Sequence, residues 1–184
     1  MDKLSCRQVL NLILSEVKGV LYRVDEEKAE KFVKEILEAK RIFLLGQGRS
    51  GLIARCFAMR LMHLGLSVYV IGETITPAIR ERDLLIVCSA SGEKLSTVKL
   101  SSLAREREAI ICALTTRKSS SLAKIAHLVV EIPVPSERSG SIQPLGSLFE
   151  QSLLLYLEGI IFSLMKRMNI SEKEMRERHT NLEV

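Results

Sequence analysis

The chain has 184 residues, of which 47% are apolar and 27% charged, and its formal net charge is +5. This length suits one domain with a large core, and the composition is typical of a globular protein and excludes a disordered or fibrous one. Lys and Arg are interspersed with Glu and there is no Trp, so the charge indicates solvated helix faces rather than a nucleic-acid surface.

Two helices are predicted before the first strand. Residues 6–20 carry apolar side chains at helical spacing, and a second helix opens with acidic residues at Asp25 and runs to about Ala39. From there, short apolar runs alternate with helical segments. The runs predict strands at 42–45, 68–71, 84–88, 109–114 and 127–132. Helices are expected between them at 52–64, 93–107 and 120–126.

These runs lack the alternation of polar and apolar residues that marks a sheet with one face in water. Continuous apolar strands separated by helices indicate a parallel sheet covered on both faces. We therefore expect an α/β fold, a three-layer αβα sandwich with a five-stranded parallel sheet of the flavodoxin type. The whole chain, 1–184, is expected to be a single domain, with N-terminal helices in 1–40 and C-terminal helices in 145–184.

A long loop rich in Pro, Ser and Gly is expected at 132–144, and loops of this length often carry function. The helix predicted at 148–168 is apolar nearly all round, so it must be covered on every side. Because the sheet already needs helices on both faces, we expect the surplus at a subunit interface of a homo-oligomer. The apolar stretch contains Glu158 and is shorter than the roughly 20 residues of a membrane span. A final helix at 171–179 opens with the capping box Ser171–Glu174.

The four cysteines are far apart and form no C-x-x-C spacing. This pattern argues against a metal site and against a disulfide framework. We expect them to be small core residues in a reducing cytoplasm. The first residues also lack the pattern of a secretory signal peptide, which agrees with a cytoplasmic location.

The sequence Gly46-Gln-Gly-Arg-Ser-Gly51 joins the first predicted strand to the following helix. Unpaired N–H groups at such a helix terminus, with the helix dipole behind them, favour an anion. The glycine spacing matches the dinucleotide fingerprint, and Glu73 lies where a ribose-binding acid would be expected. However, Arg49 and Ser50 suit a compact terminal phosphate better than a pyrophosphate that passes over bare backbone.

A second loop of this kind, Ser89-Ala-Ser-Gly92, follows the third predicted strand. The carboxyl ends of parallel strands lie at one edge of a sheet, so the two loops could converge on a single phosphate. Taken alone, Ser89 and Ser91 could be only turn and N-cap residues. Taken together, the loops predict one phosphate site. Its candidate ligands are Gly48, Arg49, Ser50, Ser89, Ser91 and Gly92.

The two loops and the layout between them resemble the sugar isomerase (SIS) domain, which binds phosphosugars. More narrowly, the first loop with the residues that follow it to Gly65 is similar to the 6-phospho-3-hexuloisomerase family. Three later blocks share this likeness and are more specific than the phosphate loops: Gly72-Glu-Thr-Ile-Thr-Pro77, Pro144-Leu-Gly-Ser-Leu-Phe-Glu150 and Arg178-His-Thr-Asn-Leu182. The resemblance runs from about Arg41 to the C-terminus.

The resemblance implies a homotetramer with active sites between subunits. It implies the reversible conversion of D-arabino-hex-3-ulose 6-phosphate to fructose 6-phosphate, a step of the ribulose monophosphate pathway, without metal or redox cofactor. Such a reaction passes through an enediol, so it needs a base for a carbon-bound proton and an acid for the oxygens. By resemblance the base is Glu150. His179 takes the acid or ring-opening role, contributed across a subunit boundary.

Each of these residues also has a purely structural interpretation. Ser147-Leu-Phe-Glu150 is a possible capping box, in which Glu150 would only satisfy the start of the long helix. His179, near a helix C-terminus, could oppose the helix dipole. Arg49 could be a substrate ligand or an ion-pair partner. His63 lies among apolar neighbours and is expected to be structural.

One position departs from the SIS pattern, because Lys94 stands where many such domains have the Thr of Ser-x-Ser-Gly-x-Thr. Its charge could replace the lost hydroxyl contact, or Ser96 or Thr97 could move in. The departure leaves open another phosphosugar aldose–ketose isomerase. A non-catalytic phosphosugar sensor is an alternative from a different class, but residues 1–40 leave little room for a DNA-binding segment. A nucleotide-binding oxidoreductase comes last.

Overall fold

The structure, a computed structural model, describes residues 4–135 and 141–182. Five parallel strands form one sheet in the order β2-β1-β3-β4-β5. Their bounds are β1 Ile42–Gly46, β2 Val68–Val70, β3 Leu84–Cys88, β4 Ile110–Thr115 and β5 Leu128–Glu131. The predicted parallel sheet is confirmed, and each strand lies within one residue of its predicted limits.

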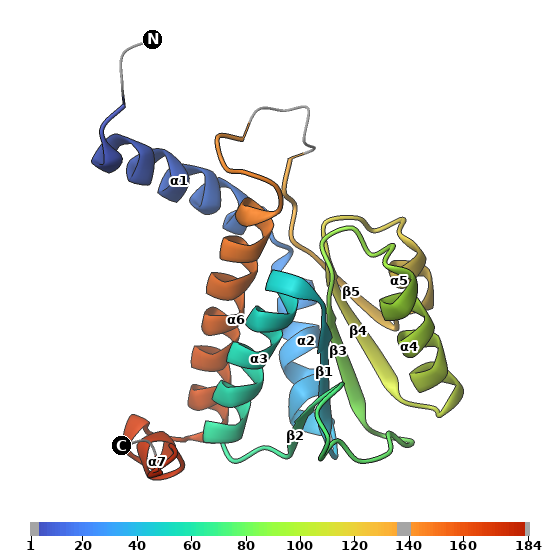
Figure 1. Ribbon diagram of the computed structural model, residues 1–184. Helices are drawn as coiled ribbons and strands as arrows, with labels where there is room; N and C mark the ends of the chain where they lie inside the picture. The colour runs from blue at the N-terminus through green and yellow to red at the C-terminus, as the bar shows by residue number, and fades with distance from the viewer. Residues whose placement is uncertain (1–3, 136–140, 183–184) are drawn as a thin grey trace.

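Seven helices are present in the described residues: α1 Cys6–Leu21, α2 Glu26–Glu38, α3 Gly48–His63, α4 Leu95–Glu106, α5 Ser121–Ile125, α6 Ser147–Met168 and α7 Glu172–Glu177. Figure 1 shows α2, α3 and α6 on one side of the sheet and α4 and α5 on the other. Three layers result, so the expected αβα sandwich is confirmed. The helix α7 lies at the lower end of α3 and α6, next to the C-terminus.

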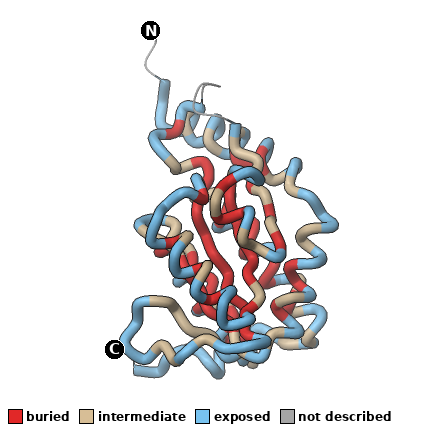
Figure 2. The backbone as a smooth tube through the Cα atoms, turned by 90° about the vertical axis from the view of Figure 1, so that its right-hand side faces the viewer, coloured by how far each residue is buried: buried red, intermediate tan, exposed pale blue. Residues whose placement is uncertain are grey.

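Alternate residues of the central strands point into two separate cores. Ile42 and Leu44 of β1 pack with residues of α1, α2, α3 and α6. Phe43 and Leu45 of the same strand pack with residues of α4 and α5. Because both faces of the sheet are buried, polar residues have no place in these strands, which explains their continuous apolar sequence. Figure 2 shows the buried strands enclosed by helices with exposed outer sides.

The helix α6 has more apolar surface than this chain covers. Its inner side is buried against α1, α2 and α3, whereas large apolar side chains on its outer side are exposed: Leu154, Leu155 and Phe162. By length and composition it is the one helix in the described residues that could cross a membrane, and half of its most apolar stretch is buried inside the chain. It is therefore placed as a core helix, with a surplus of apolar surface on its outer side.

Two helix starts differ from prediction. The helix α3 begins at Gly48 rather than at residue 52, so Gly48, Arg49 and Ser50 form its first turn. The helix α6 has Gly146 as N-cap, with no side-chain hydrogen bond, so the capping box suggested for Ser147 and Glu150 does not form. The predicted capping box at Ser171 is confirmed, because its hydroxyl accepts from Glu174 N–H while the Glu174 side chain accepts from Ser171 N–H.

The cysteines are only partly core residues. Cys88 and Cys112 are buried, and burial raises the pKa of both thiols, that of Cys88 to about 12. Cys6 and Cys56 are exposed, because they lie on the outer sides of α1 and α3, so the prediction of core positions is wrong for these two. Part of the predicted 132–144 loop, residues 136–140, lies outside the described residues.

Candidate active site

The two glycine-containing loops begin side by side at the carboxyl edge of the sheet. Gly46, the last residue of β1, is paired in register with Cys88, the last residue of β3. Because β2 lies on the far side of β1, the chain crosses over in opposite directions from these two neighbours, and ligands bind at such switch points. The loops also touch directly, since Gln47 Nε2 donates to Ser96 Oγ at 2.5 Å.

Glycine is required in both loops for different reasons. A Cβ on Gly51 would lie 2.7 Å from the Gly46 carbonyl oxygen, so the pair lets α3 pack directly on the end of β1. Gly48 has a φ of +58°, a conformation that other residues rarely adopt. In the second loop, Gly92 has a φ of +65°, and a Cβ there would lie 2.3 Å from Ser120 Oγ. Both turns are therefore fixed by backbone geometry.

Three helices begin at this edge without a side-chain cap. The N-caps of α3, α4 and α6 are Gln47, Lys94 and Gly146, and none makes a side-chain hydrogen bond to its helix. The other four described helices are all capped by a side chain, those of Ser5, Asp25, Ser120 and Ser171. Uncapped first turns leave N–H donors open to a ligand. With the helix dipoles behind them, these donors favour an anion.

The serines of the second loop take part in local turns, as the structural interpretation suggested. Ser89 Oγ accepts a hydrogen bond from Gly92 N–H at 3.3 Å, and Ser91 Oγ accepts one from Glu93 N–H at 3.3 Å. A hydroxyl that accepts still has its own proton to donate. Both side chains can therefore stabilise the loop and donate to an anion at the same time.

The three residues considered in place of the missing Thr lie differently. Lys94 is the exposed N-cap of α4. Ser96 is in the first turn of α4 and contacts Gln47 of the first loop. Thr97 is 1% exposed, and its hydroxyl has no partner in the described residues. Lys94 and Ser96 thus remain at the loop junction, whereas Thr97 belongs to the interior of α4.

The carboxylate predicted as the base lies at the same edge. Glu150 is in the first turn of α6, and its Oε2 accepts a hydrogen bond from Arg49 Nε in an ion pair. The Glu150 side chain is only 13% exposed, whereas that of Arg49 is 66% exposed. A Cβ on Gly146 would lie 3.4 Å from Glu150 Oε1, so this glycine leaves room for the carboxylate. Of the two roles considered for Arg49, the ion pair is the one that the structure contains.

His179 lies at the opposite end of α3 from Glu150. Arg49, which pairs with Glu150, is in the first turn of α3, whereas His63, the last residue of α3, stacks on His179 with ring centroids 5.2 Å apart. At 1.5 Å per residue these helix positions are about 20 Å apart. Figure 1 shows α7 at the opposite end of α6 from the start of that helix. Within one chain, the two predicted catalytic residues therefore do not share a site.

Two acidic residues near the loops are occupied by other contacts. Glu73 accepts from Arg55 Nη2 at 2.7 Å, and both side chains are about half exposed. The carboxylate of Glu93 accepts from Ser121 N–H at 3.2 Å, and hydrogen bonding to Ser121 lowers the pKa of Glu93. These contacts join elements of the fold. The ribose-binding role that Glu73 would have in a dinucleotide site finds no support here.

The sequence reasoning missed two residues of this edge, Gln47 and Gly146. Gln47 ties the two loops together, and Gly146 makes space beside Glu150. Neither residue type signals such a role. The Gln47–Ser96 contact joins residues 49 positions apart, and the space beside Glu150 depends on Gly146 being the N-cap of α6. Only the position of Gln47 between the two turn glycines, Gly46 and Gly48, would have pointed to it.

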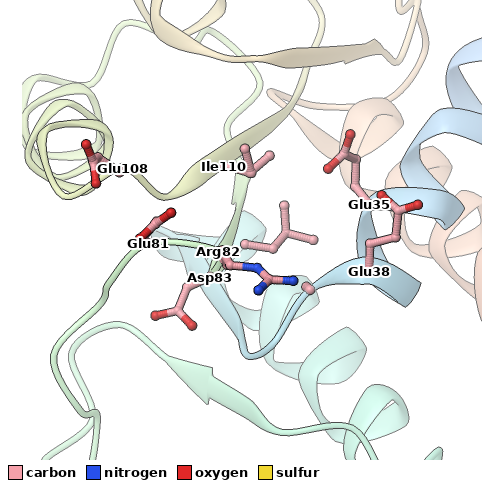
Figure 3. Close-up of a pocket in the computed structure, with 9 residues that line it drawn as sticks. Glu35, Glu38, Glu81, Arg82, Asp83, Glu108 and Ile110 are labelled. Atoms are coloured by element: carbon pink, nitrogen blue, oxygen red, sulfur yellow. The ribbon is translucent and has the colours of Figure 1, made fainter.

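A pocket at the opposite edge of the sheet has a different character. It has a volume of about 460 Å³ and lies where β3 and β4 begin. Figure 3 shows carboxylates of Glu35, Glu38, Glu81 and Glu108 around Arg82. This acidic pocket is unsuited to a phosphate, and it lies away from the carboxyl ends where ligands of such sheets bind. In residues 4–135 and 141–182, no group of three or more His, Cys, Asp or Glu side chains is placed to hold a metal ion.

The family model described as the SIS domain matches residues 35–157. The chain therefore belongs to the SIS domain family.

Among characterised relatives, a 3-hexulose-6-phosphate isomerase of Bacillus subtilis is 40% identical over 176 residues, covering 93% of this chain and 95% of the relative. A protein of the same name from Mycobacterium gastri is 42% identical over 178 residues, covering 95% and 89%. A crystal structure of a hypothetical protein from Methanococcus jannaschii matches with a TM-score of 0.86 and 36% identity, covering 95% of this chain and 98% of that chain. That structure is described as inferring a molecular function of 3-hexulose-6-phosphate isomerase.

Proposed function

We propose that this chain is an isomerase that interconverts D-arabino-hex-3-ulose 6-phosphate and fructose 6-phosphate. The relatives named for this reaction match nearly the whole chain at 40–42% identity. The observation that carries the proposal is the meeting of three uncapped helix N-termini beside one largely buried carboxylate, that of Glu150. Helix termini supply a phosphate site, and a carboxylate supplies a base. In this proposal residues 1–184 form one phosphosugar-binding domain.

The phosphate would bind between the first turns of α3 and α4. Its donors would be the N–H groups of Gly48, Arg49 and Ser50 and the hydroxyls of Ser50, Ser89, Ser91 and Ser96, while Gly92, whose N–H donates to Ser89 Oγ, would hold the turn of the second loop. Lys94 would add a positive charge at the edge of the site. Arg49 would remain within reach of both the phosphate and Glu150, which would fix the sugar relative to the base. Holding reactant and base in this way accounts for a large part of enzymatic rate enhancement.

The chemistry requires one carbon-bound proton to move between neighbouring carbons. Glu150 would take the proton from C2 of the 3-hexulose while an acid protonates O3, which gives an enediol between C2 and C3. Glu150 would then return the proton to C3 while the hydroxyl on O2 loses its own, which leaves the C2 carbonyl of fructose 6-phosphate. His179 is the proposed acid, and in this scheme its imidazole gives and then regains one proton. No step needs a metal or a redox cofactor.

The direct test is a substrate assay with the purified protein. We expect formation of fructose 6-phosphate from the 3-hexulose 6-phosphate, followed by coupled reduction of a nicotinamide cofactor, at a rate well above buffer. A panel of ketose and aldose phosphates serves as the comparison, because Lys94 differs from the common SIS pattern. If the protein turned over a different sugar phosphate of this panel and not the 3-hexulose 6-phosphate, that compound would be the substrate instead. Binding without any turnover would favour a phosphosugar sensor, and binding of a dinucleotide alone would favour an oxidoreductase.

We further propose a homo-oligomer, most simply a tetramer, in which a neighbouring subunit completes each active site. Two observations support this. Adjacent helices carry exposed apolar side chains: Leu10 and Leu12 of α1, Leu52, Met59 and Met62 of α3, and Leu154, Leu155 and Phe162 of α6. In addition, His179 is exposed and lies about 20 Å along α3 from the active site of its own chain.

The four free cysteines suit a cytoplasmic location.

Mixing two inactive variants tests the shared site. Glu150→Gln and His179→Gln should each be inactive alone, and unfolding and refolding them together should restore activity. In a dimeric unit, half of the molecules would be mixed and each would hold one intact site, so about a quarter of the wild-type activity is expected. The two variants refolded separately and then combined serve as the control. Absence of any recovery in mixed oligomers would show that one chain supplies both residues.

A further inference from the structure

The C-terminal segment is attached to the last turn of α3 through His63. The ring of His63 is only 2% exposed, although the residue lies at the very end of the helix. It stacks on the exposed ring of His179 with an angle of 29° between the planes. A buried imidazole in contact with an exposed one is unlike the simple core histidine that the apolar neighbours of His63 suggested.

Arg178 provides a second attachment at the same turn. Its Nη1 donates to the carbonyl oxygen of His63 at 3.1 Å. Its guanidinium also lies over Gly65, where a Cβ would approach to 3.4 Å, and Gly65 has a φ of +87°. Two consecutive residues, Arg178 and His179, therefore bind to one turn of α3. This fixes the direction of the His179 side chain much more firmly than the end of a six-residue helix could alone.

The surroundings of His63 favour the neutral form of its ring. Burial lowers the pKa of His63, and the nearby His179 and Arg60 lower it further. The titratable and charged groups around His63 come from each packed element: Arg60 on α3, which lies 3.8 Å from Glu158 of α6, and Arg178 and His179 after α7. A neutral ring can stack on His179 without placing a positive charge beside it.

We infer that His63 is a positioning residue for the reaction, because its buried ring holds His179 in the orientation in which the C-terminal segment presents it to a neighbouring active site. This inference rests on the proposed function and adds to it a residue that touches no substrate. It also gives α3 two tasks, since its first turn binds phosphate in its own site and its last turn orients the histidine of another.

A double-mutant cycle between His63 and His179 tests the inference. We expect His63→Ala to lower kcat roughly 10- to 100-fold with KM changed little, which is the cost of a misplaced catalytic group. In a His179→Gln background the same change should have almost no further effect, because the oriented group is already gone. His63→Phe, which keeps a flat ring, should retain most of the activity. Equal losses in both backgrounds, or a Phe variant as poor as Ala, would overturn the inference.

Leu64→Ala is the matched control, since Leu64 is the buried neighbour of His63 and packs in the hydrophobic core. It should lower stability yet act additively with His179→Gln. The chain has only three histidines, so NMR of the imidazole signals provides a readout independent of turnover. We expect the His179 signals to shift in His63→Ala and not in Leu64→Ala. If they shift while wild type isomerises no sugar phosphate, the proposed function fails and the contact stands; unshifted signals would refute the contact itself.

Discussion

Glu150→Gln is expected to lower kcat roughly 100- to 10,000-fold, the range that a general base contributes. The amide has the same shape and can still accept a hydrogen bond from Arg49, but it cannot take a proton from carbon. Sugar phosphate should therefore bind with an affinity close to that of wild type, because the phosphate donors are on α3 and α4. Turnover is measured by fructose 6-phosphate formation and binding by calorimetric titration.

The matched control for this variant is Glu158→Gln on the same helix. Glu158 is about half exposed and lies 3.8 Å from Arg60, away from the phosphate loops. It should keep full activity. Folding of Glu150→Gln should also change little, by about 1 kcal/mol or less, because the ion pair with Arg49 has one largely exposed partner and Glu150 caps no helix. If the Glu150→Gln variant were still active, another residue would have to be the base.

Gly51→Ala should both destabilise the fold and remove sugar phosphate binding. The added Cβ would lie 2.7 Å from the carbonyl oxygen and 3.0 Å from the carbonyl carbon of Gly46, and neither backbone atom can turn aside as a side chain could. The helix α3 must then move away from β1, at a cost of about 2–3 kcal/mol. Because the first turn of α3 moves with it, its N–H groups leave the phosphate site.

Gly159→Ala provides the comparison, because nothing lies within 4 Å of the position of its Cβ in the middle of α6. Replacing an unconstrained helical glycine should raise stability by roughly 0.5–1 kcal/mol. Denaturant unfolding measures both effects, and titration with fructose 6-phosphate measures binding. If Gly51→Ala were as stable as wild type and bound the ligand normally, close packing of the two glycines would not be what forms the phosphate turn.

The sheet could be predicted from the sequence because one physical rule dominates it. Every central strand is buried on both faces, so runs such as 84–88 are apolar without interruption and their limits are visible. The convergence of the two loops follows from the same rule, since parallel strands end at a common edge. For the strands and the shared edge, the local sequence pattern is therefore enough to predict the arrangement in the fold.

The helix starts at the site could not be predicted in this way. The first turn of α3 contains two glycines, Gly48 and Gly51, which have low helical propensity, and the turn has no apolar periodicity. Ser147 and Glu150 have the spacing of a capping box, yet Gly146 takes the N-cap position and Glu150 pairs with Arg49, about 100 residues earlier. Both exceptions occur where a ligand, rather than the chain, is proposed to satisfy the helix terminus.

The position of His179 shows a third kind of limit. Its block of sequence marked it for a role, but the stacking on His63 joins residues 116 positions apart and no local pattern encodes it. The assignment of His63 as an inert core residue was reasonable from its neighbours. Those neighbours do not indicate that the buried ring of His63 stacks on the exposed ring of His179.

The uncapped starts of α3, α4 and α6 have a consequence for how the empty protein behaves. Three helix starts without a side-chain cap meet at this edge. A bound sugar phosphate would accept hydrogen bonds from the first turns of α3 and α4 at once, and its binding energy would appear as resistance to unfolding. The folded protein would then be most stable when its substrate is abundant, so the lifetime of the folded state would increase with substrate concentration.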